Sequence, residues 1–364
     1  MNNAAKSIYL RWLPKFQLWL LFCSVIGFIT YIPAAKAELQ VRGIYITQIA
    51  LQNVKFITHT IERAKKVGIN TFVIDFEKMT EKYKKNIKLV KDNNLHYVAR
   101  IAMFPGGGTN EQVYSKVYLD RKYRLIQQAL SLGAERIQLD YIRFKNTQPP
   151  SPRNAQRIFE IIKSVRQQIN VPLEVDVFGI SSFGESKYIG QSIPLMSKVI
   201  DGLCPMLYPS HFEPYKIHAK TPYETILTAL HAMQRQLKHQ IPFKVYPYFE
   251  LFNYRWPLSN PQRLHYIREQ IKAIIDGKSD GWYAWSASSR YDNLFKVLEN
   301  SPQLAGGQPQ VAIAQPQVAI AQPQGAIAQP QGATAQPQGA TAQPQGATAQ
   351  PQVATAQPQV AIVK

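Results

Sequence analysis

The sequence predicts a (β/α)8 barrel, with an N-terminal signal or anchor segment before it and a disordered C-terminal repeat tail after it. Short β-branched or aromatic runs alternate with helical patterns between residues 38 and 307, and strict alternation favours a parallel sheet. Eight such repeats within about 270 residues favour closure into a TIM barrel over an open sheet. No G-x-G-x-x-G motif follows the first run, so a nucleotide-binding open sheet has no positive support.

Each expected strand is followed by a helical pattern. After the first strand, Ile57, Ile61 and Ala64 recur with helical spacing, and Gly68 then suits a left-handed cap. Later helices also end at glycine or proline, which stop a helix. The expected strands are Val41–Thr47, Thr71–Glu77, Tyr97–Phe104, Arg136–Phe144, Leu173–Gly179, Gly202–Pro209, Lys244–Glu250 and Gly281–Ala287.

Residues 1–37 have the layout of an export signal. Basic residues precede the apolar stretch Phe16–Ile32, and Ala35-Lys36-Ala37 supplies the small residues that a signal peptidase requires. An uncleaved membrane anchor is the alternative, although 17 residues barely span a bilayer. Either way we expect the rest of the chain to be exported, to the periplasm, the cell envelope or the medium. Association with the membrane or envelope through this segment stays open.

Residues 308–364 form a repetitive tail. Eight heptapeptides of the pattern Gln-Pro-Gln-(Val/Gly)-Ala-(Ile/Thr)-Ala, the last one varied, precede Lys364. A period of seven is typical of a coiled coil, but a proline in every unit removes a backbone donor and clashes with the preceding turn. We therefore expect a disordered, extended spacer. Wall attachment or binding of a partner are the alternatives.

The net charge of this 364-residue chain is +19. Four basic leader residues and Lys364 account for five of these charges, which leaves +14 on residues 38–307. The one dense stretch is Lys78–Lys91, and without an aromatic ladder or a nucleic-acid motif such a helix is more typical of a solvated face. We therefore expect no nucleic-acid partner.

The residue types also bear on metals and cofactors. Two cysteines cannot form a disulfide framework or a four-thiolate metal site, and Cys23 lies in the leader, which leaves Cys204 alone. The seven histidines are dispersed, and neither H-x-x-x-H nor C-x-x-C spacing occurs. We expect no metal, no cofactor and a monomeric barrel.

Acidic residues stand at the C-terminal ends of several expected strands, which is where a barrel carries its chemistry. A carboxylate among apolar neighbours is costly to bury unpaired. An ion pair with Arg100 or Arg143 is the structural alternative for any one acid, and four such strand ends together favour a functional site. The acids are Asp75 and Glu77 on the second strand, Asp140 on the fourth, Asp176 on the fifth and Glu250 on the seventh.

The two-residue period of a strand groups these acids with other polar residues. It places Gln138 and Asp140 on one face of the fourth strand, and Glu174 and Asp176 on one face of the fifth. Aromatic rings at the same strand ends suit a sugar, because rings stack on pyranose faces while carboxylates and histidine bind hydroxyls. Filling of the barrel is the alternative for most of these aromatics, and Tyr208 and Trp285 lie nearest the expected mouth.

Several blocks carry a family likeness: E-R-I-Q-L-D-Y-I-R-F at 135–144, V-D-V-F-G at 175–179, G-Q at 190–191 and P-M-L-Y-P-S-H-F at 205–212. In this order, and with V-R-G-I-Y-I-T at 41–47 and N-T-F-V-I-D at 70–75, they resemble a bacterial family of glycoside hydrolase barrels of formally unknown function, related to the α-amylase-like superfamily. The resemblance implies a (β/α)8 fold and glycosidase chemistry that uses carboxylates.

The resemblance and the strand positions together give roles to the candidates. Asp140 lies in the most specific block, on the strand where related barrels place the nucleophile or charge stabiliser, and Asp176 is the expected acid/base. Asp75 and Glu250 are challengers for these roles. For substrate binding we expect Tyr208 and His211 to contact hydroxyls, Trp285 to stack on a sugar, and Arg143 to hold a carboxylate in its charged form.

Two functions follow. The first is an exported glycoside hydrolase that cleaves O-glycosyl bonds of a poly- or oligosaccharide with a carboxylate pair. The second is a barrel that binds envelope polysaccharide without cleaving it, because residues 76–79, 105–108 and 248–252 depart from the acid-bearing segments of the family pattern.

Overall fold

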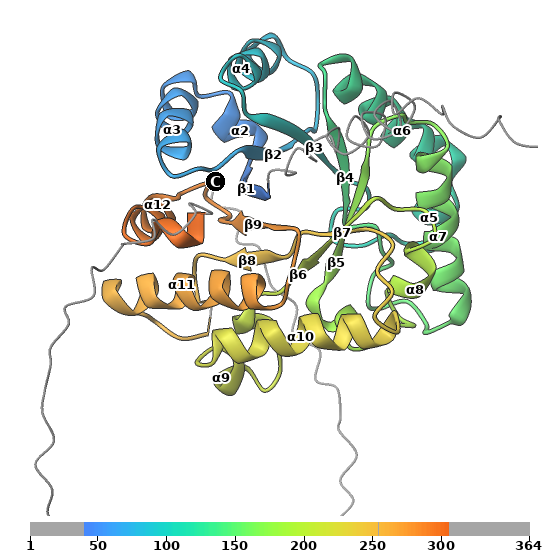
Figure 1. Cartoon of the computed structure of the whole chain (residues 1–364). Coiled ribbons are helices and arrows are strands. Elements are labelled where there is room, and N and C mark those ends of the chain that lie inside the picture. The colour runs from blue at the N-terminus through green and yellow to red at the C-terminus, as the bar shows by residue number, and fades with distance from the viewer. Residues whose placement is uncertain (1–39, 254, 306–364) are drawn as a thin grey trace, which may run out of the picture. The chain divides into compact units, whose positions relative to one another are not determined.

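The computed structural model describes residues 40–253 and 255–305 (Figure 1). The expected signal or anchor at 1–37 and the repeat tail at 308–364 lie outside the described residues. Within the described part, a ring of parallel strands is surrounded by helices, so the predicted (β/α)8 barrel is confirmed.

The strands pair in chain order and the sheet closes on itself. β1 pairs with both β2 and β9, and β6 joins β5 to β8, so no edge of the ring is left open. Every pairing is parallel, which requires a connection across the outside between strands that are paired with each other and consecutive in the chain. The strands are β1 Val41–Ile46, β2 Thr71–Asp75, β3 His96–Ala102, β4 Arg136–Asp140, β5 Leu173–Phe178, β6 Gly202–Met206, β7 Lys244–Val245, β8 Tyr248–Glu250 and β9 Gly281–Trp285.

The seventh expected strand is broken into two. β7 pairs with the start of β6, and β8 pairs with Met206 at its end and with β9. Pro247 lies between them and has no N–H group to donate to a neighbouring strand. The carbonyl of Pro247 still accepts from the N–H of Tyr283 at 3.0 Å, so the ring stays continuous across the break.

The helices follow the strands with few exceptions. Polar side chains begin them: Asn53 accepts from the N–H of Phe56, and Thr80 from that of Tyr83, both at 3.1 Å. Gly68 follows a helix with a φ of 74°, as its position predicted. The helices are α2 Gln48–Leu51, α3 Val54–Lys66, α4 Glu81–Asp92, α5 Asn110–Tyr114, α6 Lys116–Ser131, α7 Pro152–Arg166, α8 Ile193–Met196, α9 Tyr215–His218, α10 Pro222–Gln236, α11 Asn260–Asp276 and α12 Asp292–Glu299, with 3-10 turns η1 Gly179–Ser182, η2 Pro209–His211 and η3 Pro302–Ala305.

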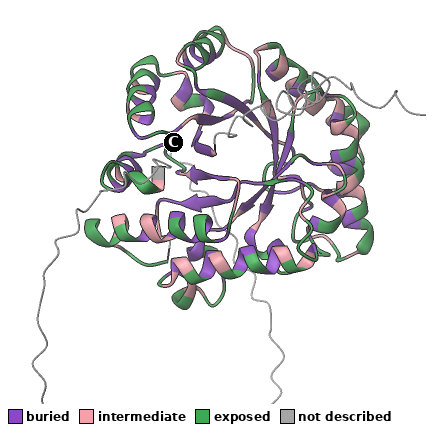
Figure 2. Cartoon of the chain, in the orientation of Figure 1, coloured by how far each residue is buried: buried purple, intermediate pink, exposed green. Residues whose placement is uncertain are grey.

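The core has two layers, and Figure 2 shows the buried strands inside a shell of helices with buried inner and exposed outer faces. Outward-facing strand residues such as Ile44 and Phe72 pack against the helices. Inward-facing residues such as Val73 and Tyr283 fill the barrel itself. Gly43 is required there, because a Cβ at this position would lie 2.4 Å from Cδ1 of Tyr283.

The barrel interior is more polar than the sequence led us to expect. The buried carboxylate of Glu174 accepts from the amide of Gln138 at 3.0 Å, from the hydroxyl of Tyr283 at 3.0 Å and from Arg136 at 3.2 Å. Tyr248 in turn donates to Gln138 Oε1 at 2.8 Å. A satisfied network of this kind fixes the register of β4 and β5 below the strand ends.

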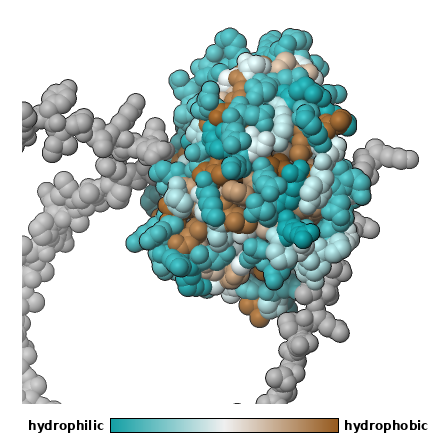
Figure 3. All heavy atoms as spheres, turned by 90° about the vertical axis from the view of Figure 1, so that its right-hand side faces the viewer, coloured by the Kyte–Doolittle hydropathy of each residue, from teal (hydrophilic) through white to brown (hydrophobic). Residues whose placement is uncertain are grey.

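The outer surface of the described part is mainly polar. Figure 3 shows the face formed by α5, α6, α7 and α8 as largely hydrophilic with scattered apolar side chains. On α4 the lysines are exposed, and Lys84 and Lys88 pair with Glu81 and Asp92 of the same helix, which confirms the predicted solvated face. Among residues 40–253 and 255–305, no helix has both the length and the apolar character to span a membrane.

Candidate active site

The acids of β2, β4 and β5 meet around one guanidinium at the barrel mouth. Asp75 lies beside Arg100 in the β2–β3 register, and Asp140 lies beside Ala102 in the β3–β4 register. Arg100 therefore reaches both neighbours: Nη1 donates to Asp75 Oδ1 and Nη2 to Asp140 Oδ2. Its Nε lies 3.7 Å from Oδ2 of Asp176. The sequence analysis considered Arg100 as an ion-pair partner of one acid. In the structure, Arg100 contacts three carboxyl groups.

Asp140 is held by the backbone that follows it. Oδ1 of Asp140 accepts the N–H of Tyr141, while Oδ2 contacts Arg100. Tyr141 has a φ of 50°, which is costly for a residue with a bulky side chain. This turn ends β4 at Asp140 instead of at Phe144 as predicted, and it presents the carboxyl group at the mouth.

Asp176 has a different environment. Its side chain is 2% exposed, and its Oδ1 has no hydrogen-bond partner among the described residues. Burial, followed by the negative charge of Asp140, raises the pKa of Asp176 well above its ordinary value, although Arg100 opposes this. Gln191, in a segment noted in the sequence, fixes the strand end by accepting the N–H of Phe178 at 2.9 Å and donating to the carbonyl of Asp176 at 3.4 Å. Asp176 therefore holds its proton more strongly than an exposed aspartic acid does.

This raised pKa predicts a pH dependence of stability. An acid whose native pKa exceeds its unfolded value of about 3.9 stabilises the fold at low pH and loses this contribution as pH rises through the native pKa. In Asp176→Asn, the free energy of unfolding should decrease less steeply with rising pH than in the wild type, by up to about 1.4 kcal/mol per pH unit. Urea unfolding from pH 4 upward measures it, with the surface variant Asp120→Asn as control. An identical slope in wild type and Asp176→Asn would show that Asp176 is ionised in the native state.

Asp75 is tied into the wall of the site. Besides its contact with Arg100, it accepts a hydrogen bond from the hydroxyl of Tyr45 on β1. Burial, and then the charge of Asp75, raise the pKa of Tyr45, so this hydroxyl remains a donor. Asp75 thus helps to fix Arg100, and its carboxylate has both oxygens engaged.

Aromatic side chains form the opposite part of the mouth, at the ends of β6 and β9. The rings of Tyr208 and Trp285 stack with centroids 4.9 Å apart and 18° between their planes. His211 meets Tyr208 at 5.5 Å in an edge-on arrangement. Three of the residues predicted to bind sugar are therefore brought together, with Trp285 half-buried, Tyr208 buried and His211 exposed.

Glu250 belongs to a second polar cluster. It is fully buried and accepts from both the N–H and the hydroxyl of Ser210 at 2.8 Å, and from the hydroxyl of Tyr266 on α11 at 2.7 Å. His211 Nδ1 lies 3.6 Å from Oε2 of Glu250. Glu250 therefore fastens η2 to β8 and α11, and no contact joins it to Arg100 within the described residues.

Because Glu250 accepts several buried hydrogen bonds, its replacement is expected to lower the stability of the fold strongly. Glu250→Ala should lower the free energy of unfolding by about 3 kcal/mol, because the N–H of Ser210 and the hydroxyl of Tyr266 would be left buried without an acceptor. Tyr266→Phe, which removes a single donor, should cost about 1 kcal/mol. Urea denaturation checks both variants. If Glu250→Ala unfolds at the wild-type midpoint, Glu250 does not hold these elements together.

Arg143 makes no ion pair with a carboxylate among the described residues. Its guanidinium donates to the carbonyls of Phe144 at 2.9 Å and Gly106 at 3.3 Å, and it lies 4.7 Å from the ring centroid of Phe178. The turn at Tyr141 carries the backbone off the face of β4 before Arg143. Arg100 is the guanidinium that contacts the carboxyl groups, while the predicted roles of Arg143 stay a prediction.

The donor sets in the described ranges give no sign of a metal centre. No group of three or more His, Cys, Asp or Glu in residues 40–253 and 255–305 is arranged to hold a metal ion. Three carboxyl groups approach one another around Arg100. The positive charge of this guanidinium balances their negative charge, as a metal cation would in a metal centre. The residues present at this site suit acid–base chemistry.

Solved structures show the same fold. They include an endo-1,4-β-mannanase from Rhizomucor miehei (11% identity, TM-score 0.55, 74% of this chain and 95% of that chain). An endo-β-1,4-mannanase from Thermotoga petrophila matches with 12% identity and a TM-score of 0.54 over 74% of this chain and 77% of that one. The spore cortex-lytic enzyme SleL from Bacillus cereus matches with 11% identity and a TM-score of 0.51 over 71% and 73%.

Identities this low establish the fold alone, which is a (β/α)8 barrel. No curated protein matches the chain. A family model with the description "putative glycosyl hydrolase domain" matches residues 109–291. The matched segment runs from α5 to the start of α12 and contains Asp140, Asp176 and Tyr208, whereas Asp75 and Arg100 precede it. Because the match covers half of the chain, the protein belongs to this family of glycosyl hydrolase domains.

Proposed function

We propose that the protein is an exported glycoside hydrolase that cleaves O-glycosyl bonds of a poly- or oligosaccharide with Asp140 and Asp176. The observation that carries this proposal is the contrast between two neighbouring carboxyl groups. Asp140 is ion-paired with Arg100, whereas burial and the charge of Asp140 raise the pKa of Asp176. Environments that divide two carboxyl groups into an anion and an acid are the requirement for glycosidic cleavage.

The division of roles follows from the two environments. Asp176, protonated, donates its proton to the glycosidic oxygen, so that the leaving sugar departs as a neutral alcohol. Asp140, as the carboxylate, attacks the anomeric carbon or stabilises the positive charge that develops there. Water then completes the hydrolysis, and the carboxylate left on Asp176 recovers a proton from it. Arg100 positions both groups without entering the reaction.

The aromatic side of the mouth supports a sugar substrate. The stacked rings of Trp285 and Tyr208 offer an apolar surface, and His211 beside them provides a polar ring nitrogen. Pyranose rings combine apolar faces with a rim of hydroxyls, so they match a surface of this composition. Ser210, held by Glu250, keeps η2 and thereby His211 in place.

The leader supports the exported location. Its basic residues, apolar stretch and small-residue pattern are those of a segment that directs a chain out of the cytoplasm. We propose that the barrel works as a monomer in the periplasm, the envelope or the medium. Fractionation of cells that express the full chain tests this, and recovery of the protein in the cytoplasm alone would contradict it.

A screen of polysaccharides tests the hydrolase proposal. The purified full-length protein should release reducing ends from at least one bacterial or host glycan, and the release should be linear in enzyme concentration. The panel should contain peptidoglycan, chitin, β-mannan, α-glucan and acidic polymers, because the fold alone selects none of them. Binding without release on every member would contradict a hydrolase.

A second candidate function is a barrel that binds envelope polysaccharide without cleaving it. The observation that favours it is that Arg100 contacts both Asp140 and Asp176, each nearly buried, as a structural ion pair would. Asp140→Asn separates the two functions. In a hydrolase it removes turnover and leaves binding, whereas in a binding barrel there is no turnover to remove.

A further inference from the structure

A cluster of aromatic and basic side chains lies on α9, on the turn that follows it and on the loop between β8 and α11. We call it the α9 patch: Tyr215, Lys216, Ile217, Lys220, Arg255 and Trp256. Trp256 is 38% exposed and Ile217 is 59% exposed, and large apolar side chains this exposed in one place mark an interaction site. α9 projects from the barrel beneath α10 in Figure 1.

Two cation–π pairs build the α9 patch. Nζ of Lys220 lies 4.0 Å from the ring centroid of Trp256, and the guanidinium of Arg255 lies 4.0 Å from that of Tyr215. The Arg255–Tyr215 pair joins the loop after β8 to α9, and the Lys220–Trp256 pair joins that loop to the turn that follows α9. Arg255 also forms a hydrogen bond with the side chain of Tyr215. Because stacking uses the face of the ring, the N–H donors of Lys220 and the other N–H donors of Arg255 stay available to a ligand.

The charge of the α9 patch is positive. Lys216, Lys220 and Arg255 pair with no carboxylate in the part of the chain that the structure describes. The nearest acid in sequence, Glu213, accepts the hydroxyl of Tyr215 at 2.6 Å and is exposed. An anionic ligand would therefore meet three cations and one carboxylate.

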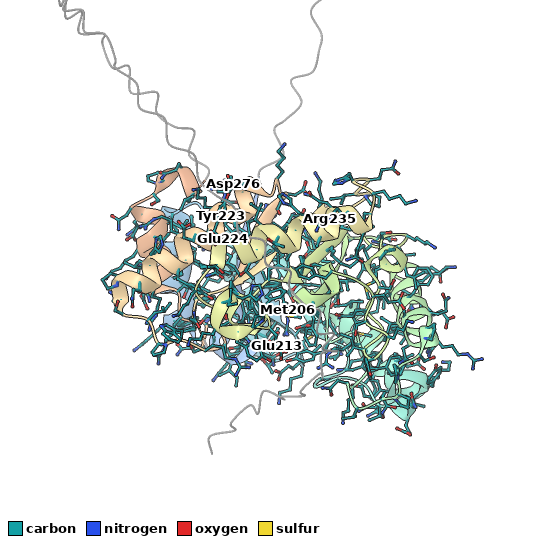
Figure 4. The ribbon with its side chains drawn as sticks, turned by 90° about the horizontal axis from the view of Figure 1, so that it is seen from below. Met206, Glu213, Tyr223, Glu224, Arg235 and Asp276 are labelled. Atoms are coloured by element: carbon teal, nitrogen blue, oxygen red, sulfur yellow. The ribbon has the colours of Figure 1, made fainter. Side chains whose placement is uncertain are left out.

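The α9 patch follows directly from the mouth. η2, which carries His211, precedes α9, and Asn253, three residues after Glu250, donates to the carbonyl of Ala219 at 2.6 Å. Figure 4 shows Glu213 and Met206, the last residue of β6, apart from Arg235 and Asp276 near the ends of α10 and α11. A polymer that leaves the mouth between β6 and β8 reaches α9 next.

We propose that the α9 patch is an accessory binding surface for an acidic polysaccharide, separate from the catalytic carboxyl groups. Aromatic rings stack on the sugar faces, and the stacked cations bind the acidic groups of the chain. Continuity with the mouth favours a polysaccharide over an anionic membrane. This proposal rests on the proposed function in one respect: the proposed function makes a polysaccharide the ligand at the mouth. Binding at the α9 patch itself requires no cleavage.

The test measures binding of the full-length protein to polygalacturonate and hyaluronan by titration calorimetry, with a neutral glucan alongside. Trp256→Ala and the double variant Lys220→Gln/Arg255→Gln should each weaken binding to an acidic polymer by about tenfold. Tyr114→Ala is the matched control, because Tyr114 is also exposed, at 57%, with the guanidinium of Arg157 4.8 Å from its ring centroid. Added salt should reduce the difference between wild type and the double variant.

The same titrations in the Asp140→Asn background keep the two proposals apart. If the wild type turns over no glycan, while binding in both backgrounds still depends on Trp256, the hydrolase is contradicted and the α9 patch is supported. Equal binding by wild type, Trp256→Ala and the double variant would overturn the α9 patch. Binding of the wild type to vesicles with anionic lipids, but to neither polymer, would overturn it in favour of a membrane.

Discussion

Asp140→Asn is expected to lower the rate of glycan hydrolysis by about a thousandfold or more, because the carboxylate that we propose to act at the anomeric carbon is replaced by a neutral amide. The side chain keeps its size, and its Oδ1 can still accept the N–H of Tyr141. Substrate binding should therefore change little, so the loss should appear in kcat. Reducing-end release at saturating polysaccharide measures kcat, and titration of the same variant measures affinity.

Two controls belong with this prediction. Asp92→Asn alters a surface carboxylate that pairs with Lys88, and it should leave kcat unchanged. Asp75→Asn alters the acid that contacts Arg100 and Tyr45, and a smaller loss is expected because Asp75 acts through Arg100. If Asp140→Asn keeps a kcat within a few-fold of the wild type, Asp140 is not the catalytic carboxylate.

Arg100→Ala should be the most destabilising substitution in the barrel. Three carboxyl groups surround this guanidinium, and two of them are almost completely buried. Removal of one partner from a buried ion pair typically costs about 3 to 5 kcal/mol, because the remaining charge is left unbalanced. Urea unfolding at pH 7 measures the loss, and Lys88→Ala, which breaks an exposed pair, should cost about 0.5 kcal/mol.

The pH dependence identifies the cause of that loss. Without Arg100 the buried acids repel one another, so their native pKa values should rise above those of the unfolded chain. Stability would then fall as pH rises through these values, and part of it should return on acidification to about pH 5. A destabilisation of Arg100→Ala that is the same at pH 5 and pH 8 would indicate lost packing instead of unbalanced charge.

The arrangement of strands and helices could be predicted from local pattern. Val41–Thr47 and Thr71–Glu77 show the β-branched and aromatic runs of buried parallel strands, and the structure places β1 and β2 within them. Where the prediction of strand bounds failed, two backbone features were decisive. Pro247 breaks the seventh strand, and the left-handed conformation of Tyr141 ends β4 early. The periodicity of hydrophobic residues reveals neither feature, although Pro247 itself is visible in the sequence.

The site was predictable only in part. The acids of β2, β4 and β5 were found because a barrel exposes the ends of its strands. Their common partner depends on register, which sets Asp75 beside Arg100 and Ala102 beside Asp140. A two-residue period in β3 places Arg100 on the inner face, and that signal was available in the sequence. The contact between Tyr266 and Glu250 could not be predicted from the sequence, because Tyr266 lies on a helix that comes near Glu250 only in the folded chain.

The central claim is that Asp176 supplies the proton and Asp140 supplies the negative charge, and a comparison of leaving groups tests it most directly. The measurement is kcat for wild type, Asp140→Asn and Asp176→Asn on the natural glycan and on an aryl glycoside of the same sugar with an acidic phenol. An acidic phenol departs without help from a general acid. The account predicts that Asp176→Asn loses turnover of the glycan but keeps most turnover of the aryl glycoside, whereas Asp140→Asn loses both. Equal losses of Asp176→Asn on both substrates, or turnover retained by Asp140→Asn, would contradict it.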